Sequence, residues 1–127
     1  MTFNYARIQG REISYATGNP KGIFALCWRM IYDGQMEKGD EERFREIDDW
    51  FKEYLPEPGP CQRNEAVITY FKTETTKDML EKLKPVMCLL EKYKKPYDLI
   101  YTNFVGEIIY EDKWQVAVRA GKGKENL

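Results

Sequence analysis

Histidine is absent from this chain of 127 residues. Without an imidazole, the chain cannot form Ser-His or Cys-His nucleophile pairs, imidazole general bases, or metal sites that need a histidine ligand. It also lacks a Walker-type glycine loop and a G-x-G-x-x-G motif. The three cysteines, Cys27, Cys61 and Cys88, are too scattered for a structural zinc site. We therefore predict no metal site and no cofactor.

Long hydrophobic runs are also missing. No stretch approaches the roughly 18 apolar residues of a membrane span, and Met1–Tyr5 lacks the basic and then apolar layout of a signal peptide. Cys27 and Cys88 fall on the apolar faces of expected helices, which indicates buried thiols in a reducing compartment. These features favour a cytoplasmic protein without a membrane partner. The net charge of −1 gives no reason to expect nucleic acid as a partner.

The composition is that of a folded protein. With 43% hydrophobic and 14% aromatic residues, the chain is long enough to bury a core without disulfide bonds. We expect a single domain over residues 1–127, with an ordered core over 1–119 and a frayed tail over 120–127.

The most regular pattern covers residues 66–118. Val67–Phe71 is short, β-branched and aromatic, which predicts a strand. Tyr97–Tyr101 predicts a second strand, and Glu107–Tyr110 with Trp114–Val118 predicts a closing hairpin. Because a long crossover separates the first two strands, we expect them to be parallel. The result is a βαββ unit with a mixed sheet.

One long amphipathic helix is expected between the first two of these strands. Thr75 or Thr76 offers a hydroxyl N-cap, and Thr75 with Asp78 fits a capping box. Pro85 lies inside the helix and predicts a kink rather than an end. The apolar residues recur at helical spacing and form one face for a sheet: Met79, Leu80, Leu83, Val86, Met87 and Leu90.

The N-terminal half completes an α+β fold. Phe3–Ala16 predicts a β-hairpin that turns near Gln9-Gly10. Asn19-Pro20 marks the start of a short helix that ends at Gly34. Asp40 caps a second helix of medium length. The expected fold is thus the βαββ unit, an N-terminal β-hairpin and two short-to-medium helices.

Two groups of polar residues are candidate sites. Lys72, Thr75 and Thr76 lie at the start of the long helix, where backbone N–H groups, hydroxyls and a lysine can hold a phosphate or carboxylate. A capped helix with solvated lysines explains the same residues. We assign no catalytic residue, and Glu107 and Glu111 are the carboxylates that come nearest to such a role. Carboxylates at a strand edge also block aggregation.

Aromatic residues are the third candidate feature. Nine tyrosines and three tryptophans exceed what a core of this size needs, and each tyrosine hydroxyl requires a partner. An aromatic wall beside an arginine suits a planar ligand or a protein hot spot. A sheet core whose tyrosines extend their hydroxyls to the rim is the alternative. The aromatic residues and arginines concerned include Tyr70, Tyr101, Trp114, Arg7, Arg11 and Arg29.

Several short motifs give the chain a family resemblance. They are Gly22-Ile23-Phe24, Cys27-Trp28-Arg29, Trp50-Phe51, Tyr70-Phe71-Lys72 and Gly106-Glu107-Ile108. In these motifs, and over nearly its whole length, the chain resembles small uncharacterised bacterial proteins. The resemblance implies a bacterial or phage source and supplies no activity, substrate or catalytic residue.

Together these patterns predict a non-catalytic binding or interaction module for a protein, or for a small anionic or planar ligand. A homodimer through a sheet edge or an aromatic face is left open. The residues expected to bind are Arg29, Tyr70, Lys72, Thr75, Thr76, Tyr101 and Trp114. The alternative is a small enzyme, or a binder of a phosphorylated or nucleotide ligand, with its site at the start of the long helix. In this alternative Glu107 or Glu111 is the acid or base, and the residues that contact the anion are Arg29, Lys72, Thr75 and Thr76.

Overall fold

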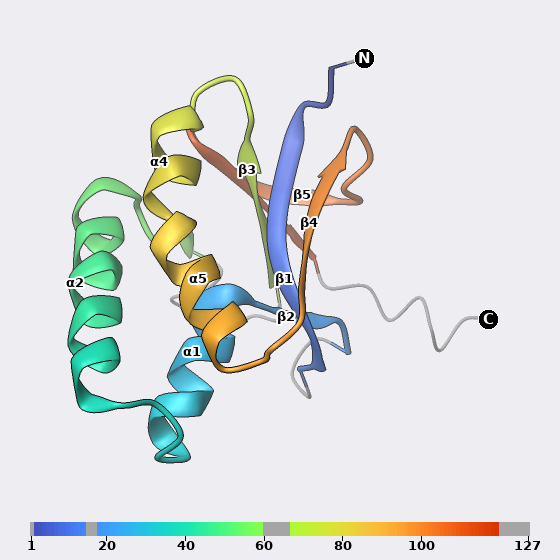
Figure 1. Cartoon of the computed structure of the whole chain (residues 1–127). Coiled ribbons are helices and arrows are strands. Elements are labelled where there is room, and N and C mark those ends of the chain that lie inside the picture. Colours follow the sequence, from blue (N-terminus) through green and yellow to red (C-terminus); the bar gives the residue numbers. More distant parts are fainter. Residues whose placement is uncertain (1, 15–17, 60–66, 120–127) are drawn as a thin grey trace.

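The structure is a computed structural model that describes residues 2–14, 18–59 and 67–119. It confirms an α+β fold, in which helices cover one face of a curled, six-stranded antiparallel sheet (Figure 1). The tail predicted over 120–127 lies outside the described residues, as does Cys61. In chain order the elements are β1 (Tyr5–Ile13), β2 (Pro20–Gly22), α1 (Ile23–Tyr32), α2 (Lys38–Tyr54), β3 (Val67–Lys72), α4 (Lys77–Lys82), α5 (Lys84–Lys92), β4 (Tyr97–Thr102), β5 (Ile108–Glu111) and β6 (Gln115–Arg119).

Strand β1 is the centre of the sheet. Tyr5 and Ala6 pair with both β3 and β4, so these two strands lie on opposite edges of β1. Gln9 pairs with both β2 and β4, which places β2 on the same edge as β3. Strands β6 and β5 follow beyond β3.

The prediction of a mixed sheet is wrong, because every pairing between the described strands is antiparallel. Strands β3 and β4 do run in the same direction, since both are antiparallel to β1. A crossover helix sets the direction of the returning strand but does not make the two strands adjacent. Here β1, from the N-terminus, is inserted between them.

Gly10 lies within β1 and not in a turn, so the hairpin predicted to turn at Gln9-Gly10 is misplaced. A Cβ atom on Gly10 would lie 2.6 Å from Cδ2 of Leu26 in α1. The glycine therefore lets α1 pack closely against the strand. The chain reverses later, where the N–H of Ser14 donates to the carbonyl of Asn19 at 2.9 Å.

The start of α1 also differs from the prediction. Pro20 begins β2, an edge strand in which a proline needs no N–H for the ladder, and α1 starts after Gly22. The end of α1 is as expected, because Gly34 has a φ of +70°. Its N–H donates to the carbonyl of Ile31 at 3.0 Å.

The helix predicted as one kinked element is two helices, α4 and α5, with Leu83 between them. The N–H of Leu83 donates to the carbonyl of Met79 at 3.2 Å, and the N–H of Met87 donates to the carbonyl of Leu83 at 3.0 Å. Pro85 has no N–H for the carbonyl of Glu81, which interrupts the ladder. It lies instead in the first turn of α5, where a proline is tolerated.

The core lies between the helices and the sheet. Ala6 and Ile8 of β1 face it, and α5 packs on both α1 and α2. The largest side chains that are almost fully enclosed are Leu26, Met30, Phe44, Leu83, Val86 and Leu90. Burial of each such aliphatic or aromatic side chain stabilises the fold by about 1.5–3 kcal/mol. Cys27 is buried as predicted, and burial raises the pKa of its thiol to about 12. The prediction that Cys88 is buried is wrong, because Cys88 lies on the outer side of α5 and is exposed.

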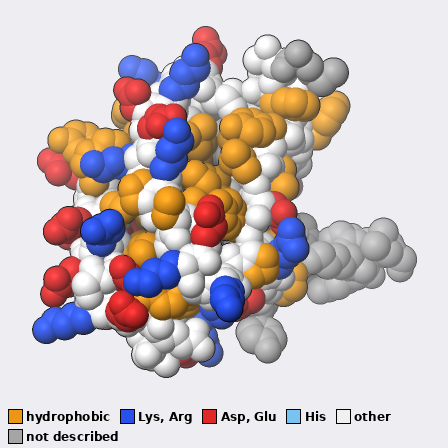
Figure 2. Space-filling model, in the orientation of Figure 1, with side chains coloured by type: hydrophobic (Ala, Val, Ile, Leu, Met, Phe, Trp, Pro, Cys, Tyr) orange, Lys and Arg blue, Asp and Glu red, His pale blue; other side chains and the backbone are white. Residues whose placement is uncertain are grey.

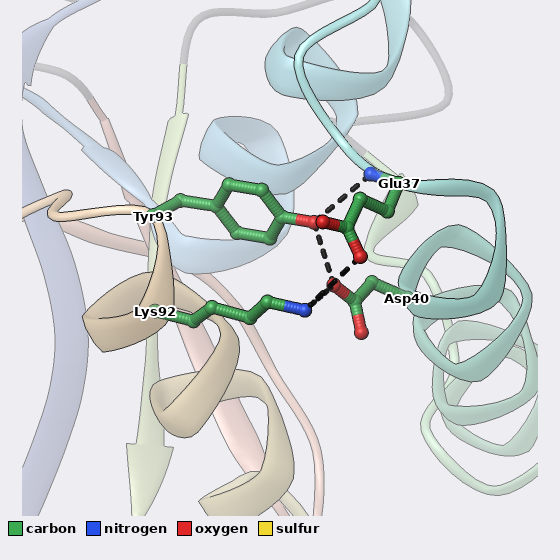
Figure 3. A network of polar contacts seen from close by, with 4 residues as sticks. All are labelled: Glu37, Asp40, Lys92 and Tyr93. Atoms are coloured by element: carbon green, nitrogen blue, oxygen red, sulfur yellow. Dashed lines mark hydrogen bonds and ion pairs between the residues drawn. The ribbon is translucent and has the colours of Figure 1, made fainter.

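A polar network joins the start of α2 to the end of α5 (Figure 3). The Tyr93 hydroxyl accepts a hydrogen bond from the N–H of Glu37 at 2.9 Å and donates to Oδ2 of Asp40 at 2.5 Å. Nζ of Lys92 donates to the same oxygen at 2.7 Å. Hydrogen bonds from Lys92 and Tyr93 hold the pKa of Asp40 below its usual value. Asp40, predicted as the N-cap, lies in the first turn of α2, and Glu37 occupies the N-cap position.

Candidate interaction surface

Three of the predicted binding residues lie together at the junction of β3 and α4. The N–H of Lys72 donates to the carbonyl of Trp114 at 2.7 Å, and the Thr75 hydroxyl donates to the carbonyl of Lys113 at 2.6 Å. Nζ of Lys72 lies 2.6 Å from Oε2 of Glu111. The lysine charge and the threonine hydroxyl are therefore already satisfied within the protein.

Thr76 has a structural part in the same junction. It is fully buried, and its hydroxyl donates to the carbonyl of Lys72 at 2.6 Å. No side chain caps the start of α4, so the capping box predicted for Thr75 and Asp78 does not form. Both threonine hydroxyls donate to carbonyl oxygens instead of accepting from the helix.

Arg29 is not part of this junction. It lies on α1, at the opposite end of the molecule from the β3–α4 turn (Figure 1), and Nε of Arg29 is 3.2 Å from Oδ2 of Asp33. The structure therefore does not assemble the anion site that was predicted from Arg29, Lys72, Thr75 and Thr76.

The two carboxylates considered for acid–base chemistry each face a basic side chain. Oε1 of Glu107 lies 3.5 Å from Nε of Arg119, while Glu111 pairs with Lys72. Both carboxylates are largely exposed to solvent. Their arrangement is that of two ion pairs at the ends of β5.

The aromatic residues are divided between two uses. Most of those on the helices form a chain of ring contacts between α1 and α2, in which the Trp28 and Phe44 centroids are 5.4 Å apart. Tyr70 and Trp114, predicted to bind a partner, are half-buried. Trp114 packs against the core, and the guanidinium carbon of Arg7 lies 6.0 Å from the ring centroid of Tyr70. Of the three aromatic residues predicted to bind, Tyr70, Tyr101 and Trp114, Tyr101 is the exposed one.

Tyr101 belongs to an exposed apolar surface, which we call the β4 patch. Its members are Phe3, Leu99, Tyr101 and Phe104, whose exposed fractions are 36%, 43%, 47% and 90%. The ring centroids of Phe3 and Tyr101 are 6.5 Å apart. Figure 2 shows hydrophobic side chains that extend across this face of the molecule, from the α4–α5 helices towards β4.

The register of β4 explains why the patch is exposed. Leu99 lies opposite Ile8 of β1, and Tyr101 lies opposite Ala6. Opposite residues in an antiparallel pair point to the same face of the sheet. Leu99 and Tyr101 therefore continue the face that buries Ile8 and Ala6. The helices cover β1 and the start of β4, where Tyr97 packs against the core, but they leave Leu99 and Tyr101 exposed.

The backbone of β4 is also available on one side. Among the described strands, β4 pairs only with β1, and its register runs without a bulge from Tyr97 to Thr102. Its single charged residue is Asp98, which Arg11 pairs at 3.1 Å. An unbulged edge with no uncompensated charge is a template for another strand.

A broad depression of about 920 Å³ adjoins the β4 patch. Phe3 and Tyr101 line it on the patch side, and Lys72, Glu74 and Lys77 line it on the side of the β3–α4 turn. Two predicted binding residues, Lys72 and Tyr101, are thus brought to one surface. Sequence reasoning missed Phe3, Leu99 and Phe104, because nothing in the local pattern indicates that the helices leave these side chains exposed.

Within the described ranges, no helix has the length and apolar character needed to cross a membrane. The same residues contain no group of three or more side chains suited to hold a metal ion. Comparison with known proteins finds no matching family model, no similar curated protein and no similar solved structure.

Proposed function

We propose that the protein is a non-catalytic interaction module that binds an extended chain segment along β4, and that this segment is β4 of a second copy. The observation that carries the proposal is the coincidence of an unprotected strand edge with the β4 patch. Strand addition of this kind supplies main-chain hydrogen bonds, while side chains on one face supply specificity.

The sequence of β4 suits pairing with itself. In an antiparallel pair centred on Leu99, that residue lies opposite its own counterpart, and Tyr97 lies opposite Tyr101 of the second copy. Aromatic and aliphatic cross-strand pairs each stabilise a sheet by about 0.2–1 kcal/mol. Asp98 lies opposite Ile100 of the second copy, so no two like charges are opposed.

The flanking aromatic residues extend this contact. A stable interface buries roughly 800 Å² on each partner, which is more than one strand of six residues supplies. Phe3 and Phe104 lie beside β4 and enlarge the apolar area. We expect a weak, concentration-dependent dimer.

The test is the mass of the protein in solution as a function of concentration, by sedimentation velocity. We expect the wild type to dimerise and Leu99→Lys to weaken dimerisation about tenfold or more, because two lysines then face each other across the symmetry axis. Ile13→Lys is the matched control. Ile13 is an exposed aliphatic residue on β1 beyond the part that pairs with β4.

Hydrogen exchange on the same samples locates the contact. We expect the amides of β4, but not those of β5, to become more protected as the protein concentration rises. A wild type that stays monomeric up to about millimolar concentration overturns the proposal. So does a Leu99→Lys variant that dimerises as well as Ile13→Lys.

A further inference from the structure

The sheet contains a fork where β3 and β2 leave the same edge of β1, and Arg7 lies at this fork. Its NH1 donates to the carbonyl of Thr69 in β3 at 2.9 Å, and its NH2 donates to the carbonyl of Pro20 in β2 at 3.0 Å. Nε donates to Oε1 of Gln9 at 3.0 Å. The guanidinium thus bonds to both strands at the point where they separate.

Among the residues that the structure describes, no carboxylate neutralises the charge of Arg7. None of the ion pairs between described residues includes it. The side chain is half-buried, and burial lowers its pKa. A guanidinium carries five N–H donors, and its hydrogen bonds to the described residues use three of them. A half-buried cation with no carboxylate partner among the described residues favours an anion beside it.

A cleft of about 300 Å³ opens next to Arg7. Its walls are mainly apolar and include Phe24, Leu55, Phe71 and Leu83. This volume is at the lower end of the range for small-molecule sites. Benzene fills an engineered cavity of about 150 Å³, so the cleft accommodates roughly a dozen non-hydrogen atoms.

The first turn of α1 forms another wall of the cleft, through Gly22 and Ile23. No side chain caps this helix, and no acidic residue lies in its first turn. The positive end of the helix dipole is therefore uncompensated there. A Cβ atom on Gly22 would lie 3.6 Å from NH2 of Arg7, so the helix start and the guanidinium adjoin.

We propose that this cleft binds a small amphiphilic carboxylate. Its carboxylate lies between Arg7 and the first turn of α1, and its short apolar body occupies the cleft towards Phe71 and Leu83. The lining of the cleft combines a cation, Arg7, with apolar walls, as such a ligand requires. The inference is independent of the function proposed for β4, which concerns another edge of the sheet.

Three probes separate the contributions of the charged end and the apolar end of the ligand. Hexanoate has both the charge and the apolar body, hexanol has the body alone, and acetate has the charge alone. We expect hexanoate to raise the thermal midpoint in a concentration-dependent way. We expect calorimetry to give hexanol and acetate affinities at least about tenfold weaker than that of hexanoate. Hexanol lacks the hydrogen bonds between a charged group and Arg7, and acetate lacks the buried methylenes; each loss is worth at least that factor.

Equal binding of hexanol contradicts the role of Arg7, and equal binding of acetate indicates an adventitious anion only. If none of the three probes raises the midpoint, the cleft does not bind this class of ligand and the proposal fails.

Two variants localise the binding. Ala25→Leu fills the mouth of the cleft and leaves Arg7 unchanged, because Ala25 is an exposed residue of α1 that lines the cleft. We expect it to lower hexanoate affinity about tenfold or more. Arg11→Met is the control, since Arg11 lies on the same strand but pairs with Asp98 outside the cleft.

Arg7→Met tests the guanidinium directly, but it also removes two hydrogen bonds that hold the fork. Ala25→Leu decides the question if Arg7→Met does not fold. Undiminished hexanoate binding by Ala25→Leu, or loss of binding in Arg11→Met, overturns the assignment.

Discussion

The outer strands β4 and β5 present their free edges in different ways. Strand β5 has four residues, a register shift between Ile108 and Tyr110, and Glu107 and Glu111 at its ends. Strand β4 has six residues, an unbroken register and one charge, which Arg11 pairs. Short length, bulges and charges are the usual means by which proteins block strand addition. The β5 edge is short, shifted in register and flanked by two carboxylates, whereas the β4 edge is longer, unbroken in register and carries one carboxylate.

The two strands are also held in place differently. The hairpin of β5 and β6 is fixed by Asp112, whose Oδ1 accepts from the N–H groups of Trp114 and Gln115 at 2.8 and 2.9 Å. Its Oδ2 accepts from the Tyr110 hydroxyl at 2.7 Å. Strand β4 depends instead on contacts far along the chain, namely its pairing with β1 and the Tyr97 hydroxyl, which donates to Oε2 of Glu91 in α5 at 2.6 Å. The difference teaches that β5 is stabilised from within its own hairpin, whereas β4 is stabilised by elements outside its own turn.

The largest effect is expected at Gly10, the residue that lets α1 pack on β1. Gly10→Ala places a Cβ atom 2.6 Å from Cδ2 of the buried Leu26. We expect it to lower the free energy of unfolding by about 1–3 kcal/mol, as other overpacked cores do. Urea denaturation measures this. Gly39→Ala is the matched control and should stabilise by about 0.5–1 kcal/mol, because Gly39 is helical with nothing within 4 Å.

A double-mutant cycle sharpens the same point. In a Leu26→Ala background, the methyl group that Gly10→Ala meets is gone, so the second substitution should cost much less. If Gly10→Ala is equally destabilising in both backgrounds, close packing against Leu26 is not the reason for the glycine.

An intermediate effect is expected from acidification, which acts on both edges. Burial alone would raise the pKa of Asp112, but the hydrogen bonds from Tyr110, Trp114 and Gln115 outweigh it and lower the pKa. The hydrogen bonds from Arg11 lower the pKa of Asp98 on β4. The unfolded chain therefore takes up protons first as the pH falls. Stability should be fully present above the ordinary aspartate pKa of about 4 and be lost as the pH falls through the lowered values.

Asp112→Asn and Asp98→Asn separate the two contributions. We expect Asp112→Asn to lower the free energy of unfolding at pH 7 by about 1 kcal/mol, since it loses hydrogen bonds to a charged acceptor. The variant should also lose less stability than the wild type as the pH falls. Asp98→Asn should leave the stability at pH 7 nearly unchanged, because its ion pair is exposed. Denaturant unfolding from pH 7 to pH 2 measures both. If the two variants lose the same amount of stability between pH 7 and pH 2, Asp112 does not stabilise its edge more than Asp98 stabilises the other.

The smallest effect concerns the turns that lead into the two strands. The chain approaches β4 through Lys94, whose φ is +57°, and approaches β5 through Gly106, whose φ is +97°. A residue with a Cβ atom is strained in this region by about 1 kcal/mol or more. Lys94→Gly should therefore stabilise by about 0.5 kcal/mol after the greater freedom of glycine in the unfolded chain is subtracted. Gly106→Ala should destabilise by about 1 kcal/mol, and thermal unfolding of both variants tests the opposite signs.

Much of the local structure could be predicted from the sequence. The apolar residues from Met79 to Leu90 recur at helical spacing, and Met79, Leu83, Val86 and Leu90 are buried as expected. The predicted ranges of β3, β4 and β6 agree with the structure to within one residue. These elements are encoded by residues close together in the chain, so local patterns identify them.

The errors arose where a residue serves a distant contact. Gly10 has the composition of a turn, but its glycine is required by Leu26 of α1. Thr75 has the spacing of a helix cap, but its hydroxyl donates to the carbonyl of Lys113. In both cases a tertiary partner competed with the local signal and prevailed. Thr76 differs, because its hydroxyl donates to the carbonyl of Lys72, only four residues earlier.

The candidate surface shows the same division. Tyr101 could be singled out as one of many aromatic residues, and its strand could be located. That β4 lies at an edge follows from the insertion of β1, where Tyr5 pairs with Thr102 from the other end of the chain. The sequence by itself determined the helices, most of the strands and the apolar stripes, because these depend on spacing of a few residues. Only the tertiary structure decided which strand is left unpaired and which apolar side chains are left uncovered, because edge pairing and burial depend on residues far apart in the chain.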